Sequence, residues 1–491
     1  MSDTRPAAPS AQEHADRGFF GQPSMLSALF GVEMWERFSF YGMQGILLIY
    51  LYYSAEQGGL GIPEATAAGI VGAYGGLVYL STIVGTWLAD RVLGAERTLF
   101  YAAIVVMAGH IALAVIPGLA GVGVGLVLVA LGSGGVKGNA TSLVGTLYAP
   151  DDERRDAGFS LFYLGINLGA LVGPLLTGLL QSTAGFHVGF GLAAVGMAAG
   201  LIQYAIRRKN LPAKAHEVPS PLGDRERRRA IVGGALAVVV IVVLALTGVL
   251  SADRLDLAVI VVTSAAAVGY FALMLGSGRV TPVERHRVLA FIPLWIASAA
   301  FWSLYQQQFT VVTIYSDQRL DRNLFGWEFP VAWVQSINPI FIIVLSGVFA
   351  ALWTKLGSRQ PPTPVKFGLG AAIMGVAFLL FLPMAGGGPN SAPLLGLIGV
   401  LFVFTIAELM ISPVGLSVST KLAPEAFRAQ MVGLFFLSVA LGSALSGALA
   451  GFYSEESERA YFGVLGAVAI AIGVLVVLST PLLKRLMEGV R

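Results

Sequence analysis

The sequence predicts an all-α polytopic membrane protein. Of its 491 residues, 56% are hydrophobic and only 12% are charged, and the mean hydropathy is +0.76. A water-soluble domain carries roughly a quarter charged residues, so this composition excludes an ordinary soluble protein. The 61 glycines agree with a membrane interior, because small residues let membrane helices approach one another closely. The chain has no cysteine, which excludes disulfides, thiol catalysis and thiolate metal sites.

The first 206 residues predict a tail and a helical bundle. Residues 1–23 are polar and contain no short apolar stretch typical of a cleavable signal peptide, so we expect a mobile cytoplasmic tail. A membrane helix needs about 20 apolar residues, and six runs of about this length predict an N-terminal six-helix bundle over residues 24–206. The runs lie near 25–53, 66–89, 97–116, 121–148, 157–182 and 187–206.

The rest of the chain predicts an insertion and a second bundle. A basic linker at 207–229 leads to an inserted helix pair and a cytoplasmic loop at 230–287. The pair, near 230–250 and 256–276, holds few polar residues beyond serine and threonine and is expected to face lipid. A C-terminal six-helix bundle is expected over 288–485, followed by a short tail at 486–491. Its six runs lie near 288–316, 331–354, 366–384, 393–420, 427–452 and 460–483, which brings the predicted total to fourteen spans.

The placement of Lys and Arg supports this count. With the N-terminus inside, two of the 31 basic residues fall within spans (Arg37 and Lys137), four fall in external loops, and all others fall in cytoplasmic loops and tails. The four external residues are Arg254, Arg319, Arg322 and Arg459. This asymmetry follows the positive-inside rule and predicts that both termini are cytoplasmic. Because topology explains the basic residues, the net charge of +3 is no sign of nucleic-acid binding.

The first predicted span carries a polar stripe. On a helix, the spacing of Glu33, Glu36, Arg37, Phe40, Tyr41 and Gln44 places all six residues on one face. Glu33 and Arg37 are four residues apart, in the orientation that favours an ion pair. A stripe of this kind faces a bundle interior or a water-filled path and is a functional candidate. The alternative is a buried salt bridge that only fixes packing.

Other polar residues within the spans are few. Lys137 lies in the fourth span, where a lone ammonium costs about 2.5–3.5 kcal/mol and therefore needs a carboxylate or a bound anion. Glu408 lies mid-span, shortly before Pro413, which invites a kink. Asn167 and Asn338 fit an interhelical hydrogen bond as well as a ligand contact.

Enzyme chemistry is not indicated. The five histidines are scattered, and only one lies within a predicted span. We find no metal-ligand spacing and no nucleophile with a matching base, so the sequence predicts no catalytic residues, no metal and no cofactor.

Two loops resemble each other and a known signature. The run 85–97 follows the second span of the first set, and the run 347–359 follows the second span of the second set. The first run resembles the loop signature of the major facilitator superfamily. The resemblance implies a gating loop with Asp90 and Arg91, and two six-helix bundles around a central site that is reached alternately from each side.

A more specific resemblance covers about residues 25–450. Glu33-x-x-Glu36-Arg37-Phe-x-Phe-Tyr41-Gly resembles the ExxERFxYYG motif of the proton-dependent oligopeptide transporter family, also called the peptide transporter family. The run 158–169, with Asn167, resembles its fifth-helix signature. Phe301-Trp302, the run 338–341 and the run 408–417 resemble its seventh-, eighth- and tenth-helix motifs. The inserted pair is what bacterial members have.

The resemblance implies a proton-coupled symporter that imports di- and tripeptides by alternating access across the bacterial inner membrane. We expect it to act as a monomer in the lipid bilayer. It implies proton coupling by Glu33, Glu36 and Arg37. It implies that the peptide amino end meets Glu408, Asn167 and Asn338, and that Lys137, Tyr41 and Tyr79 lie toward the carboxylate. The remaining implied binding residues are Gln44, Trp302, Gln306, Phe435 and Ser438.

The chemistry of the substrate fits independently. A short peptide offers an ammonium and a carboxylate, and a site that reads both ends needs one anion and one cation. Lys137 and Arg37 are the only cations within the predicted spans, and Glu408 is the only carboxylate in the spans of the second half.

Several positions depart from the family pattern. Phe40 stands where many members have Tyr, Gln44 where many have Arg, and Phe435 where many have Trp. Gln306 stands where many have an acidic residue, so a salt bridge from Lys137 to the seventh helix cannot form. Two alternatives stay open: a major facilitator transporter of another small solute, and a transporter-like peptide sensor.

Overall fold

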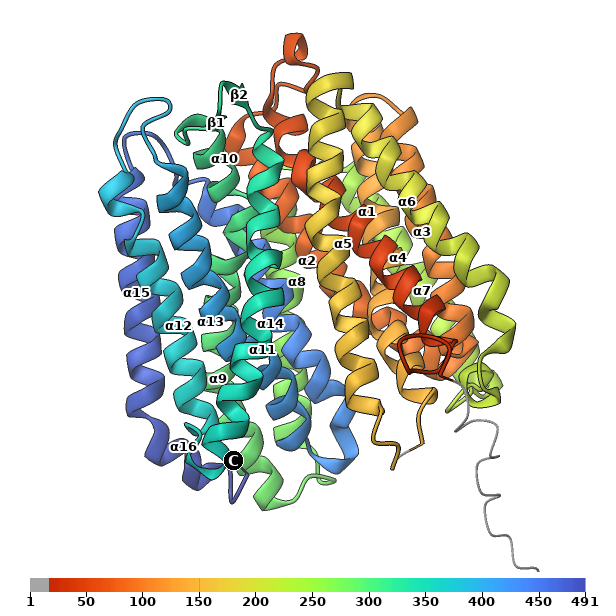
Figure 1. The fold of residues 1–491 in the computed structure, drawn as a ribbon. Helices are drawn as coiled ribbons and strands as arrows, with labels where there is room; N and C mark the ends of the chain where they lie inside the picture. The colour runs from red at the N-terminus through yellow and green to blue at the C-terminus, as the bar shows by residue number, and fades with distance from the viewer. Residues whose placement is uncertain (1–16, 150, 491) are drawn as a thin grey trace, which may run out of the picture.

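The computed structural model describes residues 17–149 and 151–490 as a bundle of long helices (Figure 1). The N-terminal bundle is drawn in red to yellow and the C-terminal bundle in green to blue. The first bundle and the inserted pair consist of α1 Leu26–Tyr52, α2 Glu64–Leu88, α3 Ala95–Val115, α4 Gly118–Thr146, α5 Arg155–Ala184, α6 Phe186–Arg207, α7 Asp224–Leu246 and α8 Leu255–Gly276.

The second bundle begins with a long helix, α9, that is followed by a short turn and a second, shorter helix, α10. It consists of α9 Pro282–Tyr305, α10 Val311–Gln318, α11 Ile337–Leu356, α12 Thr363–Leu379, α13 Leu394–Lys421, α14 Arg428–Ala450, α15 Glu458–Leu478 and α16 Thr480–Leu486. A small antiparallel hairpin, β1 Asn323–Leu324 and β2 Trp327–Glu328, lies in the loop after α10. Short turns of helix are η1 Ala55–Gln57, η2 Ala89–Leu93, η3 Arg208–Asn210, η4 Ala213–His216, η5 Ala252–Arg254, η6 Gln306–Phe309, η7 Val331–Ser336, η8 Gly357–Arg359, η9 Leu382–Met384 and η10 Glu425–Phe427.

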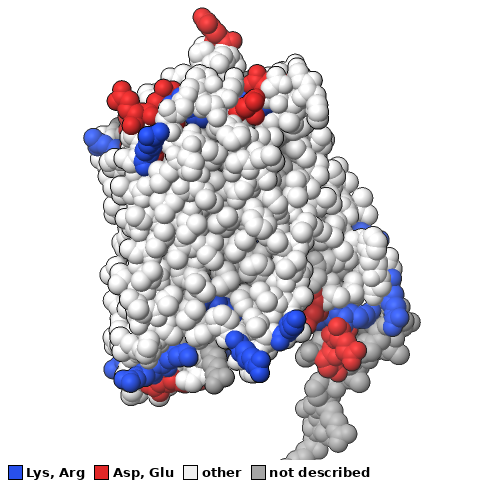
Figure 2. All heavy atoms as spheres, turned by 60° about the vertical axis from the view of Figure 1, so that its left-hand side comes forward, with Lys and Arg blue, Asp and Glu red and all other residues white. Residues whose placement is uncertain are grey.

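The predicted fold class is confirmed. Thirteen helical segments within the described residues are long and apolar enough to cross a membrane, and they coincide with thirteen of the fourteen predicted spans. The fourteenth is α1, whose 27 residues extend about 40 Å. Its polar stripe lowers its hydropathy, yet α1 packs directly against α5 and α6 inside the bundle. Figure 2 shows the charged residues of one face gathered at the two ends, with an uncharged band between them.

The predicted tail at 1–23 falls largely on residues 1–16, which lie outside the described residues. Its last part is docked on the bundle. Phe19 and Gln22 form a tight turn with backbone hydrogen bonds of 3.1 and 2.9 Å. The Tyr148 hydroxyl donates to Gln22 Oε1 at 3.0 Å, and the Gln22 side chain is buried.

Glycine brings α2 against both α4 and α14. A Cβ added at Gly85 on α2 would lie 2.6 Å from the Gly134 carbonyl oxygen on α4. A Cβ added at Gly72 would lie 2.7 Å from the Gly447 Cα on α14. Only glycine permits such approaches, because any side chain there would push the helices apart. The first contact sets the position of α4, which carries Lys137, and the second joins the two bundles.

The inserted pair lies outside the two bundles. None of the residues of α7 is buried, as expected for a helix that faces lipid. α8 packs against both α2 and α14 with the buried side chains Val259, Thr263 and Ala267. It therefore touches both bundles along one edge.

A buried ion pair connects three loops at the end of the molecule where the β1–β2 hairpin lies. Arg319 Nε lies 2.9 Å from Glu458 Oε1, and both side chains are buried. Glu458 also accepts hydrogen bonds from the Gly386 N–H at 2.7 Å and from the Tyr453 hydroxyl at 2.9 Å. The carboxylate thus joins the segments that follow α10, α12 and α14.

We expect Glu458→Gln to destabilise the protein by about 3–5 kcal/mol, because it leaves the buried Arg319 charge without its main partner. Glu455→Gln is the matched control. Glu455 also pairs with Arg319, at 3.5 Å, but its side chain is 67% exposed, and an exposed pair contributes only about 0–1 kcal/mol. Thermal unfolding of both variants in the same detergent measures the difference, and equal midpoints would contradict the assignment.

Candidate functional site

The polar stripe of α1 forms a buried charge cluster. Arg37 Nε lies 2.9 Å from Glu33 Oε1, and Arg37 Nη2 lies 3.0 Å from Glu36 Oε2. Ser133 on α4 donates its hydroxyl proton to Glu36 Oε1 at 2.7 Å. All three charged residues are buried. The ion pair expected from the spacing of Glu33 and Arg37 is present, and Arg37 bridges two carboxylates.

A cavity of about 190 Å³ lies between the two bundles. Helices α1, α2 and α5 of the first bundle and α9, α11 and α13 of the second bundle contribute to its walls, together with η6 and η7. Six of the predicted site residues line it: Tyr41, Tyr79, Asn167, Trp302, Asn338 and Glu408. The other lining residues are Tyr163, Ile166, Ala170, Tyr305, Gln308, Phe309, Gln335, Pro339, Ile342 and Ser412.

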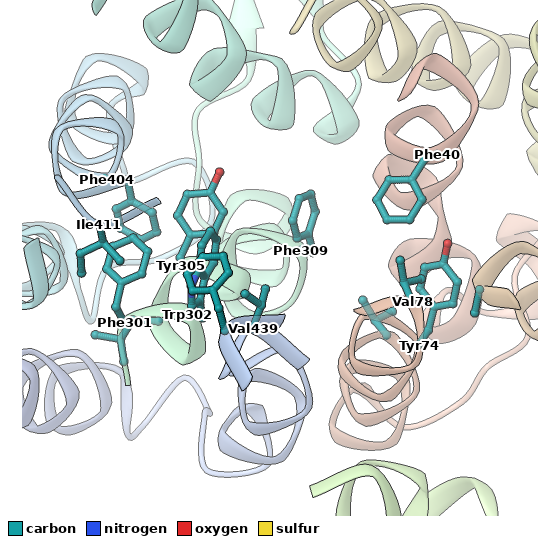
Figure 3. Close-up of a cluster of buried hydrophobic side chains, with 14 of the residues drawn as sticks. Phe40, Tyr74, Val78, Phe301, Trp302, Tyr305, Phe309, Phe404, Ile411 and Val439 are labelled. Carbon is teal, nitrogen blue, oxygen red and sulfur yellow. The ribbon is translucent and has the colours of Figure 1, made fainter. Parts of the chain in front are cut away.

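Aromatic rings from both bundles border this region. Figure 3 shows Phe40 and Tyr74 from the first bundle on one side, and Phe301, Trp302 and Phe309 from the second bundle on the other. The Tyr41 ring lies 6.1 Å from the Phe309 ring across the interface of the bundles. The rings of Tyr41, Trp302 and Phe309 line the cavity beside a few polar groups, which is the usual composition of a small-molecule site.

The second bundle supplies the anion of the cavity. Asn338 Nδ2 donates to Glu408 Oε2 at 3.3 Å and to Thr405 Oγ1 at 3.0 Å. The Tyr305 hydroxyl donates to Asn338 Oδ1 at 3.2 Å, which fixes the orientation of that amide. Within the part of the chain that the structure describes, Glu408 has no ion-pair partner. A half-buried carboxylate held by an amide can therefore accept a cationic group from a ligand.

The first bundle supplies the cation, Lys137. It does not line the cavity itself but contacts the ring of Tyr79, which does. Lys137 Nζ lies 4.4 Å from the centre of the Tyr79 ring and 4.8 Å from the centre of the Phe40 ring. No carboxylate among residues 17–149 and 151–490 is paired with it. A desolvated cation–π contact contributes about 2 kcal/mol, so two ring faces offset much of the roughly 2.5–3.5 kcal/mol that a lone ammonium costs in a membrane.

The remaining predicted binding residues do not line the cavity. The Gln44 side chain is buried, and its Oε1 atom has no hydrogen-bond partner among the described residues. Gln306 is buried at the start of η6. The Phe435 ring packs over Gly415, and Ser438 shares a hydrogen bond of 2.8 Å with Ser298.

The predicted gating loop is held by the linker. Backbone N–H groups of Ser220 and Leu222 donate to the carbonyl oxygens of Asp90 and Arg91 at 2.9 and 3.1 Å. The Arg91 side chain pairs with Glu226, at the start of α7, at 2.7 Å. The loop is thus fastened to the inserted pair.

Sequence reasoning missed several lining residues that helical spacing connects to predicted ones. Tyr163 lies four residues before Asn167, and Gln335 lies three residues before Asn338. Tyr305 lies three residues after Trp302. Residues three or four apart share a helix face, so extending each motif by one turn would have found them.

The two bundles are fastened together at the end where α1 stops. The hydroxyls of Tyr52 and Tyr53 donate to the two carboxylate oxygens of Asp317 at 2.6 and 2.8 Å. Nearby, Gln318 donates to Glu64 at 2.7 Å. These bonds link α1 and α2 of the first bundle to α10 of the second.

The sequence model of the POT family matches residues 96–468, which is more than half of the chain. The chain belongs to the POT family. Relatives of this POT-family chain align over nearly its whole length. The uncharacterized transporter YclF of Bacillus subtilis is 43% identical over 477 residues, which cover 96% of this chain and 97% of the relative. A di-/tripeptide transporter of Lactococcus lactis subsp. cremoris is 40% identical over 495 residues, which cover 97% of this chain and 99% of the relative.

Solved structures of POT-family members share the fold. A mutant of a peptide transporter POT in complex with alafosfalin superposes with a TM-score of 0.92 and 45% identity, over 97% of this chain and 98% of the other. A POT family transporter in complex with 5-aminolevulinic acid superposes with a TM-score of 0.89 and 39% identity, over 96% of this chain and 99% of the other. The predicted family membership is confirmed, and the family and its named relatives are transporters.

Proposed function

We propose that this POT-family chain is a proton-coupled symporter that imports di- and tripeptides by alternating access across the bacterial inner membrane. One observation carries the proposal. Glu408 of one bundle lines the cavity, and Lys137 of the other bundle lies against the Tyr79 ring that lines it; among the described residues neither charge has an ion-pair partner. A zwitterionic peptide that bridges them would join the two bundles. The relatives named di-/tripeptide transporters support this substrate class.

The roles of the site residues follow from this arrangement. Glu408, Asn338 and Asn167 would hold the peptide ammonium, since carboxylate and amide oxygens accept its three N–H donors. Lys137 would bind the carboxylate. The hydroxyls of Tyr41 and Tyr79 would assist Lys137. Trp302 would border a side-chain pocket, while Gln44, Gln306, Phe435 and Ser438 would act from behind the cavity wall.

The end at which Asp317 joins the bundles is proposed to be external. The positive-inside distribution places both termini in the cytoplasm, and Tyr52 and Tyr53 lie at the far end of α1 from the N-terminus. The bonds to Asp317 would then close the external side, and the cavity would be served from the cytoplasm. Asp90 and Arg91 would act as the cytoplasmic gating loop. We expect a monomer to suffice, because the two bundles of one chain supply both charged groups that bind the peptide.

The charge cluster of α1 is proposed to couple protons to this cycle. Protonation of Glu33 or Glu36 would weaken its pairing with Arg37 and free Arg37 or Lys137 for the peptide carboxylate. Departure of the peptide would restore the ion pair and release the proton inward. Both glutamates pair with Arg37, so the proton is assigned to the cluster rather than to either residue.

Uptake into liposomes tests the proposal. Purified protein should accumulate a labelled dipeptide when the outside is acidic, and unlabelled di- and tripeptides should compete. 5-Aminolevulinic acid, an amine and carboxylate without a peptide bond, is a useful competitor because one relative binds it. Stronger competition by that compound than by any dipeptide would favour another small solute, and binding without uphill uptake would favour a sensor.

We expect Glu408→Gln to weaken binding of peptides that have a free amino terminus, because the variant loses the anion that faces the ammonium. A charge-assisted hydrogen bond contributes about 1.5–3 kcal/mol, so the dissociation constant should rise roughly 10- to 100-fold. N-acetylated dipeptides, which lack the ammonium, serve as the control ligands and should change little. Unchanged affinity for free dipeptides in a folded variant would remove this role.

A further inference from the structure

We infer that Phe40 is a positioning residue for substrate binding. Together with Tyr79, its ring face would hold the Lys137 ammonium ready for the peptide carboxylate, in a chain that has no acidic residue at position 306. The inference rests on the proposed function, since Lys137 is assigned there to the substrate carboxylate. It adds a role for a residue that lies outside the cavity wall.

The geometry is that of a clamp with two faces. Lys137 Nζ lies 4.8 Å from the Phe40 ring centre and 4.4 Å from the Tyr79 ring centre, within the roughly 6 Å range of cation–π attraction. The three residues come from α1, α2 and α4. The Gly85–Gly134 approach described above brings two of these helices together.

The Phe40 ring is itself held in place. It is buried, it stacks on the Tyr74 ring at 6.0 Å, and it meets the Tyr41 ring edge-on at 5.1 Å. The Phe40 ring cannot turn away from Lys137 without disturbing these contacts.

The nearby carboxylates are already engaged. Glu33 and Glu36 both pair with Arg37, and Glu36 also accepts the hydroxyl proton of Ser133. Gln306 is an amide and carries no charge. The ring faces therefore take the place that an ion-pair partner would occupy.

An aromatic face holds an ammonium differently from a carboxylate. It attracts the charge but accepts no strong hydrogen bond, so the N–H donors of Lys137 stay available. A peptide carboxylate could then bind the ammonium without first displacing an acidic partner. Phe40 would accordingly lower the concentration of peptide that is needed for half-maximal uptake.

A series of fluorinated phenylalanines at position 40 tests the clamp. Each added fluorine weakens the negative potential of the ring face while the shape of the ring changes little. We expect the KM for dipeptide uptake in proteoliposomes to rise stepwise along the series, to roughly tenfold for the most fluorinated ring, with kcat little changed. Phe40→Leu should raise KM as well. Phe40→Tyr keeps the ring face, so its KM should stay close to that of the unmodified protein.

Phe38 provides the matched control. It lies on the same helix and is buried, but its ring contacts Trp35 and packs over Gly196 on α6. The same fluorinated series at Phe38 should leave KM unchanged. If fluorination of Phe40 leaves KM unchanged while Phe40→Leu still raises it, the ring only contributes packing and the inference is overturned.

A second experiment repeats the fluorinated series at Phe40 in the variant Gln306→Glu. A carboxylate at this position would compete with the rings for the ammonium, so KM should become less sensitive to fluorination at Phe40. Undiminished sensitivity would contradict the clamp. Failure of the proposed function looks different, because the unmodified protein itself would then take up no dipeptide.

Discussion

Dipeptide uptake is expected to fall to background when Lys137 is replaced with alanine. The change removes an ammonium that lies against the Tyr79 ring of the cavity wall and that pairs with no carboxylate among the described residues. Truncating one partner of a buried charge pair costs about 2–5 kcal/mol, so affinity should fall by roughly 30-fold to several thousandfold. The measurement is initial uptake in proteoliposomes at matched protein content, with binding followed by calorimetry.

Lys355→Ala is the control for this variant, because Lys355 is exposed near the end of α11. It should transport normally. Near-normal uptake by Lys137→Ala in protein of unchanged thermal stability would place the carboxylate elsewhere in the cavity.

The sequence predicted the fold closely because membrane spans depend on local composition. The first span was expected near 25–53 and runs over Leu26–Tyr52, even though its polar stripe makes it less apolar than the other spans. The ion pair of Glu33 and Arg37 was equally predictable from the sequence, since residues four apart on one helix lie on the same face.

Contacts between helices were harder to predict. Phe435 and Ser438 lie within one turn of each other on α14, yet both are occupied by packing or a hydrogen bond away from the cavity. These helices are apolar on most faces, so hydrophobic periodicity does not reveal how each one is rotated. The position of Lys137 between two rings likewise depends on the close approach of α2 and α4, which only the assembled bundle shows.

The docking of the linker shows the same limit of local reasoning. Composition identified 207–229 as a basic segment, but the hydrogen bonds from Ser220 and Leu222 to the gating loop are backbone contacts without a sequence signature. The pairing of Arg91 with Glu226 joins segments 135 residues apart. Such long-range pairings are decided by the packing of the whole chain.

Proton-driven accumulation is expected to disappear in Glu33→Gln and in Glu36→Gln, while exchange of peptide across the membrane persists. Both glutamates pair with Arg37, so neutralising either one removes a proton acceptor from the cluster that is proposed to drive the cycle. Exchange needs no net movement of protons. It therefore reports whether the variant still folds, binds peptide and changes conformation.

The experiment compares uphill uptake under an inward proton gradient with counterflow in the same liposomes. Glu56→Gln is the control, because Glu56 is exposed in the short turn η1. Each single variant also weakens a buried ion pair, and breaking such a pair costs about 3–5 kcal/mol, so thermal stability is measured alongside. Loss of accumulation together with intact counterflow assigns the defect to coupling rather than folding. Uphill uptake that persists in the double glutamine variant, driven by a pH gradient alone, would show that the proton travels by another route.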